Sequence, residues 1–119
     1  MINYIILAIS ILLAVAGQLF MKKGMMIFGQ FPVSQLLVKI IPIFLNPYVF
    51  TGLVFFGISS VFWLVVLSRL QLSLVYPMVS VAYLLVAIFS LIFFKENISL
   101  IRAAGILVIM MGVFLISRS

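Results

Sequence analysis

Residues 69–96, RLQLSLVYPMVSVAYLLVAIFSLIFFKE, form a hydrophobic run that is long enough to cross a membrane as a helix. Small or polar side chains recur along this run at a helical interval, at Tyr76, Ser80, Tyr83, Ala87 and Ser90. These positions return to nearly the same side of an α-helix. Lipid gives a helix no reason to gather hydroxyl groups on one side. We therefore expect this stripe to face other helices or a polar cavity.

The composition places the whole chain in a membrane. Of its 119 residues, 68% are hydrophobic and 7% are charged, and the mean hydropathy is +1.56. In soluble domains about a quarter of the residues are charged. Because each span needs about 20 helical residues, a chain of this length holds at most four spans with their loops. The expected fold class is an all-α bundle of four transmembrane helices, which forms a single domain over residues 1–119.

The four hydrophobic runs expected to span the membrane cover residues 2–21, 48–68, 74–94 and 100–117. A cleavable signal peptide is an alternative for the first run, because residues 14–16 imitate a small-residue cleavage site, although no basic segment precedes it. Pro77 is expected in the first turn of the third span, where proline is tolerated. Residues 33–45 are apolar but too short to span. We expect them to form a helix at the membrane interface, with a plain hydrophobic loop as the alternative.

The first two spans carry polar groups of their own. Asn3, Ser10, Ala14 and Gln18 share one face of the first span, which gives a second small and polar stripe. In the second span, the single tryptophan, Trp63, has either a cavity role or a packing role.

The fourth span has no polar residue in its interior. Gly105 and Gly112 lie seven residues apart on it, and they predict a surface where another backbone approaches closely. We interpret this surface as a helix-packing face, between subunits of a dimer, and not as a binding site.

The formal net charge of +6 comes from basic residues at or between the ends of the hydrophobic runs. Such residues set topology and attract anionic lipid headgroups, so the expected partner is membrane lipid and not nucleic acid. Five of them lie on the first and third connections or at the adjoining helix boundary, which favours an orientation with both termini outside. The chain has no cysteine and no histidine, so we expect no disulfide framework, no metal site and no cofactor.

The whole chain resembles the four-helix members of the drug/metabolite transporter superfamily. The resemblance lies in LLAVAGQLFMKKG, in FWLVVLSRLQLSLVYPMVSVAYLLVAIFSLIFFKENIS and in AAGILVIMMGVFLI, in the same order and with the same short loops. The chain is similar to the small multidrug resistance proteins and to EamA-type domains. It is more similar to the flippase subunits for aminoarabinose linked to undecaprenyl phosphate.

The resemblance implies a fold of the small multidrug resistance type, in a homodimer or in a heterodimer with a sister subunit. In this architecture the first three helices enclose the pathway and the fourth helices dimerise. Proton-coupled multidrug exporters of this superfamily carry a membrane-embedded glutamate in the first helix, and Ala14 occupies that position here. Since intramembrane carboxylates mark proton relays, the chain lacks the central group of such an exporter.

The resemblance therefore favours a flippase, or flippase subunit, for a polyprenyl-phosphate sugar in the bacterial inner membrane. We expect the sugar to meet Gln18, Trp63, Tyr76, Ser80 and Tyr83. Each of these side chains has helix packing as its alternative role. The candidates for the phosphate are Lys22, Lys23, Arg69 and Arg102, with a topological role as the alternative for the two lysines.

Glu96, the only acidic residue, has two open roles. It either pairs with Lys95 or Arg102 near the start of the fourth helix, or it contacts the substrate.

Two other functions stay open at this point. One is a small exporter of hydrophobic or cationic compounds, and the other is a non-transporting partner subunit of a membrane glycosyltransferase complex. An enzyme is not expected, because the chain offers no set of acid, base and nucleophile for one cavity.

Overall fold

A computed structural model describes all residues from 1 to 119, and it contains helices without any β-strand. The helices are α1 (Ile2–Phe28), α2 (Leu36–Leu45), α3 (Pro47–Leu67), α4 (Leu72–Met78), α5 (Val81–Phe93) and α6 (Leu100–Ser117), and a 3₁₀ turn at Val33–Gln35 precedes α2. Four segments are long and apolar enough to cross a membrane, namely α1, α3, α4 together with α5, and α6. The expected all-α fold with four spans is confirmed.

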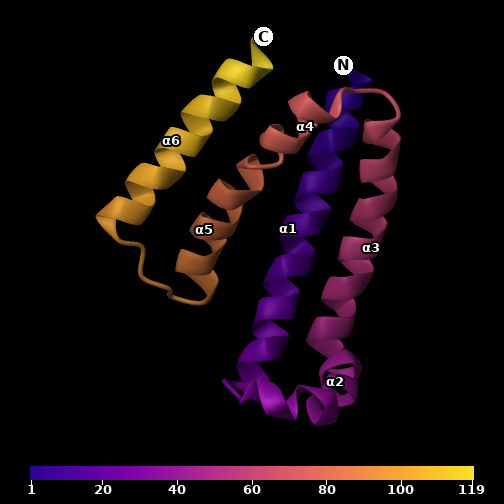
Figure 1. Cartoon of the computed structure of the whole chain (residues 1–119), viewed down its shortest axis with the longest axis vertical. Helices are drawn as coiled ribbons and strands as arrows, with labels where there is room; N and C mark the ends of the chain where they lie inside the picture. Colours follow the sequence, from indigo (N-terminus) through magenta and orange to yellow (C-terminus); the bar gives the residue numbers. More distant parts are fainter.

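The helices form a closely packed pair and a more open arm (Figure 1). α1 and α3 lie side by side and antiparallel, and α2 lies across one end of this pair. α4, α5 and α6 follow on the other side of α1, and both termini lie at the same end of the molecule. The helix expected at residues 33–45 is present as the 3₁₀ turn and α2. Its position at a membrane interface stays a prediction.

Glycine residues let the backbones of α1 and α3 approach closely. A Cβ atom on Gly17 would lie 2.7 Å from the carbonyl oxygen of Gly52, and one on Gly52 would lie 2.6 Å from that of Gly17. Further along, a Cβ atom on Gly24 would lie 2.5 Å from Cγ2 of Val49. Any larger residue at these positions would force the helices apart, as in other membrane helix pairs that pack through small residues.

Two serines join the same helices, about two turns closer to the amino terminus of α1. The Ser59 hydroxyl donates to the Ser10 carbonyl oxygen at 2.7 Å, the Ser10 hydroxyl approaches the Ser59 carbonyl oxygen at 3.0 Å, and the two hydroxyl oxygens lie 3.2 Å apart. Both side chains are buried. Ser10, Gly17 and Gly24 recur every seven residues, which is nearly two helical turns. The small residues of α1 therefore form one continuous seam against α3.

The first helix is longer than the sequence indicated. We expected it to end at Met21, before Lys22 and Lys23, but α1 continues to Phe28 and stops at Gly29, which has a φ of 66°. Lysine is a good helix former, and its long side chain can carry the charge to an interface without ending the helix. Gly29 supplies the positive φ that commonly terminates a helix.

The third span is broken, and this corrects the expected continuous helix over residues 74–94. The helix begins at Leu72, so Pro77 lies in the interior of α4 and not in its first turn. Proline there has no N–H for the carbonyl four residues earlier and crowds it. Two residues later, α-helical hydrogen bonds are replaced by bonds to the carbonyl three residues earlier, as in a 3₁₀ helix. The Ala82 amide donates to the Val79 carbonyl at 2.8 Å, and the Tyr83 amide donates to the Ser80 carbonyl at 2.9 Å.

The break separates a fixed segment from a loosely packed one. Val75 of α4 is fully buried, and it packs with Leu7 of α1 and Val66 of α3 in the hydrophobic core. Beyond the break, α5 contains no buried residue, and α6 contains only Val113. Much of the surface of α5 and α6 is therefore left for lipid or for another subunit.

Side chains cap the two remaining long helices. The Asn46 side-chain oxygen accepts hydrogen bonds from the amides of Tyr48 at 3.0 Å and Val49 at 3.3 Å, and Pro47 occupies the first position of α3. Ser99 accepts from the Arg102 amide at 3.1 Å and so begins α6. These caps satisfy amide groups that a helix start otherwise leaves unpaired.

The seam between α1 and α3 generates a test with a matched control on one helix. We expect Gly52→Ala to destabilise the protein by about 1–3 kcal/mol, because the added methyl group overpacks the contact with Gly17. Gly57→Ala should be neutral or slightly stabilising, because nothing lies within 4 Å of its Cβ position and alanine favours helix. Unfolding in mixed micelles, followed by Trp63 fluorescence, measures both variants. Equal stability of the two variants would contradict the close approach.

Candidate functional site

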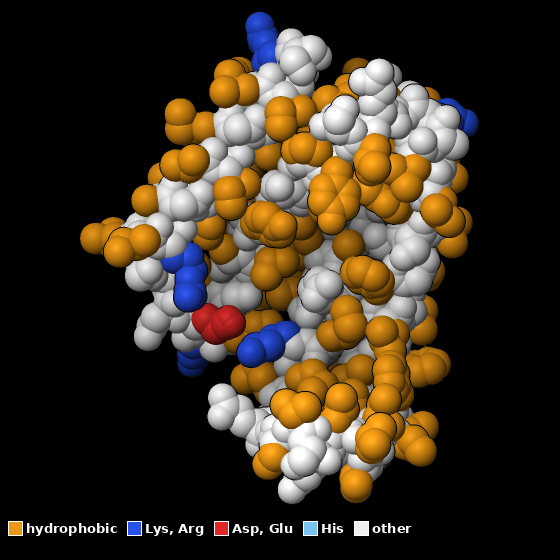
Figure 2. All heavy atoms as spheres, viewed as in Figure 1, with side chains coloured by type: hydrophobic (Ala, Val, Ile, Leu, Met, Phe, Trp, Pro, Cys, Tyr) orange, Lys and Arg blue, Asp and Glu red, His pale blue; other side chains and the backbone are white.

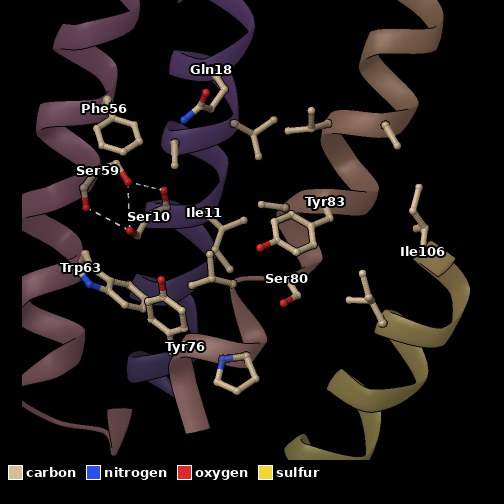
Figure 3. A pocket seen from close by; sticks show the side chains of 18 of the residues that line it. Ser10, Ile11, Gln18, Phe56, Ser59, Trp63, Tyr76, Ser80, Tyr83 and Ile106 are labelled. Atoms are coloured by element: carbon tan, nitrogen blue, oxygen red, sulfur yellow. Dashed lines mark hydrogen bonds between the residues drawn. The ribbon is translucent and has the colours of Figure 1, made fainter. Parts of the chain in front are cut away.

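A cavity of about 870 Å³ lies between the α1–α3 pair and the arm formed by α4, α5 and α6 (Figure 3). Every helix except α2 contributes to its lining. The lining residues are Ser10, Ile11, Ala14, Val15 and Gln18 of α1; Phe56, Ser59, Ser60 and Trp63 of α3; Tyr76, Pro77, Val79, Ser80, Ala82, Tyr83, Val86 and Ala87 of the broken third span; and Arg102, Ile106 and Ile109 of α6. Most of the wall is apolar, so its polar groups are few.

The two polar stripes of the sequence meet across this cavity. From α1 come Ser10, Ala14 and Gln18, and from the third span come Tyr76, Ser80, Tyr83 and Ala87. The end members of the stripes, Asn3 and Ser90, do not line it. All the residues expected to contact a sugar therefore lie around one space, as Figure 3 shows. Their contact with a ligand stays a prediction.

The polar groups of the cavity differ in what they already bind. Ser10 and Ser59 bond to each other, and the Ser60 hydroxyl donates to the Phe56 carbonyl oxygen at 3.0 Å. By contrast, no hydrogen bond is drawn from Gln18, Ser80 or Tyr83 to the other residues in Figure 3. Donors and acceptors without a partner in the protein are the ones that can bind a hydroxylated ligand.

Aromatic side chains stand at one end of the cavity. The rings of Trp63 and Tyr76 meet edge to face, with their centroids 6.5 Å apart and an interplanar angle of 65°. Tyr76 and Tyr83 are both mostly exposed, with 69% and 58% of their surface accessible. These rings combine an apolar face with a polar tip, which suits a ligand that has both kinds of surface.

Arg102 is the one charged residue in the lining of the cavity. Its guanidinium group approaches the Asn97 carbonyl oxygen at 3.5 Å, in the connection that also contains Glu96. Glu96 is half-buried there, and Figure 2 shows this single acidic side chain with basic side chains near it. Neither of the two roles considered for Glu96 is tested by this arrangement.

The other phosphate candidates lie outside the cavity. Lys22 is exposed on α1, and the Lys23 ammonium group lies 4.8 Å from the centre of the Tyr48 ring. Arg69 is at the opposite end of α1, where its guanidinium group donates to the Asn3 side-chain oxygen at 3.4 Å. The structure thus brings only one of the four candidates to the predicted sugar-binding residues.

Some lining residues were missed in the sequence. Arg102 was a phosphate candidate, but the interior of α6 was interpreted only as a packing surface, and Ile106 and Ile109 line the cavity beside Arg102. Their spacing of four and three residues is a helical signal, but an isoleucine stripe also describes any lipid-facing helix. No side chain lies within 4 Å of the Cβ positions of Gly105 and Gly112, so their face is open within one chain. Its use in a dimer stays a prediction.

The groups that line the cavity can bind polar ligands. Its lining includes neutral hydroxyl, phenol, amide and indole groups and one guanidinium group, with no carboxylate, thiol or imidazole. The protein holds no group of three or more residues that could bind a metal ion. Such a wall can bind a polar, hydroxylated or anionic group inside an otherwise apolar protein.

Comparison with known proteins gives a consistent group of relatives. The chain is 36% identical over 118 residues to a Proteus mirabilis protein named "Probable 4-amino-4-deoxy-L-arabinose-phosphoundecaprenol flippase subunit ArnF", with 92% of this chain and 86% of the relative covered. It is 33% identical over 117 residues to the protein of the same name from Serratia proteamaculans, with 92% and 88% covered.

A relative of the second subunit type is also similar. An Aeromonas salmonicida protein named "Probable 4-amino-4-deoxy-L-arabinose-phosphoundecaprenol flippase subunit ArnE" is 30% identical over 114 residues, and the match covers 96% of each chain. No family model matches the chain, and no solved structure matches it. On the identity and coverage of these relatives, the chain belongs to the family of 4-amino-4-deoxy-L-arabinose-phosphoundecaprenol flippase subunits.

Proposed function

We propose that this chain is a subunit of a flippase that moves a polyprenyl-phosphate-linked sugar across the bacterial inner membrane. The observation that carries the proposal is the polar cavity between the α1–α3 pair and the arm. A long polyprenyl tail can stay in the bilayer during transport, whereas the phosphate and the sugar must cross a hydrocarbon region that excludes unpaired polar groups. The cavity supplies polar partners within that region.

We assign the sugar to the neutral side of the cavity. Gln18, Ser80 and Tyr83 provide amide and hydroxyl groups for the sugar hydroxyls, and Trp63 and Tyr76 provide aromatic faces for the ring. Groups of this kind fix orientation and specificity in pockets whose remaining wall is apolar.

We assign the phosphate in this cavity to Arg102. Among the four basic candidates it is the residue that lines the cavity, and its guanidinium group can bind phosphate through two parallel hydrogen bonds. Phosphate at Arg102 would place the sugar deeper, toward the polar stripes. Ala14 lines the same cavity without a titrating group, so this chain offers no proton relay of its own for an exporter of cationic compounds.

We also propose that the chain works with a second subunit, either a sister chain or another copy. The relatives are named as subunits of two types, and α6 leaves the face of Gly105 and Gly112 open. Small residues on an exposed membrane helix allow a partner helix to approach closely. In the assembly we place both termini outside, because basic residues gather on the opposite connections.

A flipping assay with purified protein in liposomes tests the proposed path. The parent protein, with its sister subunit where one is needed, should accelerate flipping of a polyprenyl-phosphate aminosugar. Tyr83→Ala should reduce the rate at least tenfold, because it removes a ring and a hydroxyl group from the cavity wall. Tyr4→Ala is the matched control, because Tyr4 is exposed and does not line the cavity, and its rate should stay within about twofold.

Two outcomes would contradict the proposal. Equal rates for Tyr83→Ala and its control would remove the cavity from the path. A well-folded parent that does not flip the lipid with or without its partner would favour a non-transporting subunit of a glycosyltransferase complex.

The assignment of the phosphate has its own control on the same helix. Arg102→Gln should slow flipping by about tenfold or more, because the phosphate loses a charge-assisted partner. Arg118→Gln removes the same charge at the other end of α6, where the guanidinium group lies over the Phe114 ring, and should flip at nearly the parental rate. Labelling of a single cysteine at Ser119→Cys from outside checks that each variant keeps its orientation. Equal slowing by both substitutions would indicate a general charge effect.

A further inference from the structure

A second hollow, of about 640 Å³, lies along a different face of α1 and shares no lining residue with the central cavity. We call it the α1 groove. It is lined by Ala16, Leu19, Phe20, Lys23, Met26, Ile27, Phe93 and Phe94. The first six positions follow one another at intervals of one or three residues along α1, and the two phenylalanines come from the end of α5 and the residue after it.

The α1 groove is apolar and long enough to hold part of one extended hydrocarbon chain. Its positions on α1 span twelve residues, from Ala16 to Ile27, which is about 16 Å along a helix. Phe93 forms part of the opposite wall and is stacked on Phe89, with ring centroids 5.8 Å apart. A row of apolar side chains between two helices binds a linear hydrocarbon through dispersion contacts along its length.

Lys23 gives the groove a single charge among apolar residues. Its neighbour Lys22 lines neither the groove nor the central cavity. The Lys23 ammonium group also lies over the ring of Tyr48, which is at the start of α3. A cation at one place along an apolar groove complements a lipid that has one chain and an anionic head.

We propose that the α1 groove binds the isoprenoid chain of the phosphorylated carrier lipid, with the phosphate at Lys23. This inference rests on the proposed flippase function, and it adds a second binding site, for the lipid carrier itself. The carboxyl-terminal part of α1 and the start of α6 lie toward the same end of the molecule (Figure 1). A carrier lipid held by Lys23 therefore lies toward the same end of the molecule as Arg102. When its head enters the central cavity, Arg102 can bind its phosphate.

The alternative occupant is an ordinary phospholipid. Its head is also anionic, so the single lysine of the groove complements both lipids. The isoprenoid phosphate is favoured because it is the carrier in the proposed function.

Photo-crosslinking separates these occupants. The full-length protein in nanodiscs is irradiated with undecaprenyl phosphate that carries a diazirine in its chain and no sugar, and the labelled positions are mapped by mass spectrometry. We expect labels at residues 16–27 and 93–94. Lys23→Gln should reduce this labelling about tenfold, the loss expected for one charge-assisted contact, whereas Lys22→Gln should stay within about twofold. Lys23→Arg should retain the labelling, because it keeps the charge.

The outcomes distinguish the groove from the flippase function. Three results would each overturn the inference. They are labels found only outside the groove, an equal loss of labelling in Lys22→Gln and Lys23→Gln, and competition by excess phosphatidylglycerol that is as strong as competition by unlabelled undecaprenyl phosphate. If flipping persists while the groove is not labelled, the inference alone fails. If the groove is labelled as expected and the parent protein does not flip the lipid, the proposed function alone fails.

Discussion

The close contact between the backbones of α1 and α3 is the constraint from which the rest of the structure follows. Gly17 and Gly52 allow it, since a Cβ atom on either would lie under 3 Å from the carbonyl oxygen of the other, and Ser10 and Ser59 extend it with buried hydrogen bonds. In lipid there is little hydrophobic drive between helices, so packing of this kind and interhelical hydrogen bonds hold them together. The contact fixes one wall of the cavity and the positions of Gln18 and Trp63 on it.

The opposite wall is held differently. Val75 anchors α4 to the core that contains Leu7 and Val66, but the helix breaks after Pro77, and α5 has no buried residue. The two halves of the third span therefore differ in packing, and Ser80 and Tyr83 lie at and just beyond the junction. The cavity therefore has one closely packed wall and one wall with few buried contacts within a single chain.

The sequence predicted the spans and the polar cavity residues well because both depend on helical period. Tyr76, Ser80 and Tyr83 share a face at the α-helical period, they still line one cavity although the helix breaks between them, and hydroxyl groups in an apolar helix stand out. It predicted the long-range partners poorly. The recurrence of Ser10, Gly17 and Gly24 every seven residues was visible, but glycine in an apolar run does not say which helix it meets. Arg102 was expected near a phosphate, but in the apolar interior of α6 nothing distinguished Ile106 and Ile109 from lipid-facing residues. The end of α1 and the break after Pro77 depend on where each helix begins and ends, which periodicity fixes least well.

The central claim is that the head group enters the cavity between the two walls, and protection of a cysteine tests it most directly. The chain has no cysteine of its own, so Ser80→Cys places a nearly isosteric thiol in the cavity, and Ser73→Cys places one at an exposed site earlier in the same span. The account predicts that a polyprenyl-phosphate aminosugar slows maleimide labelling of Ser80→Cys severalfold and leaves labelling of Ser73→Cys unchanged. Unchanged labelling of Ser80→Cys at saturating lipid, or equal slowing at both positions, would contradict it.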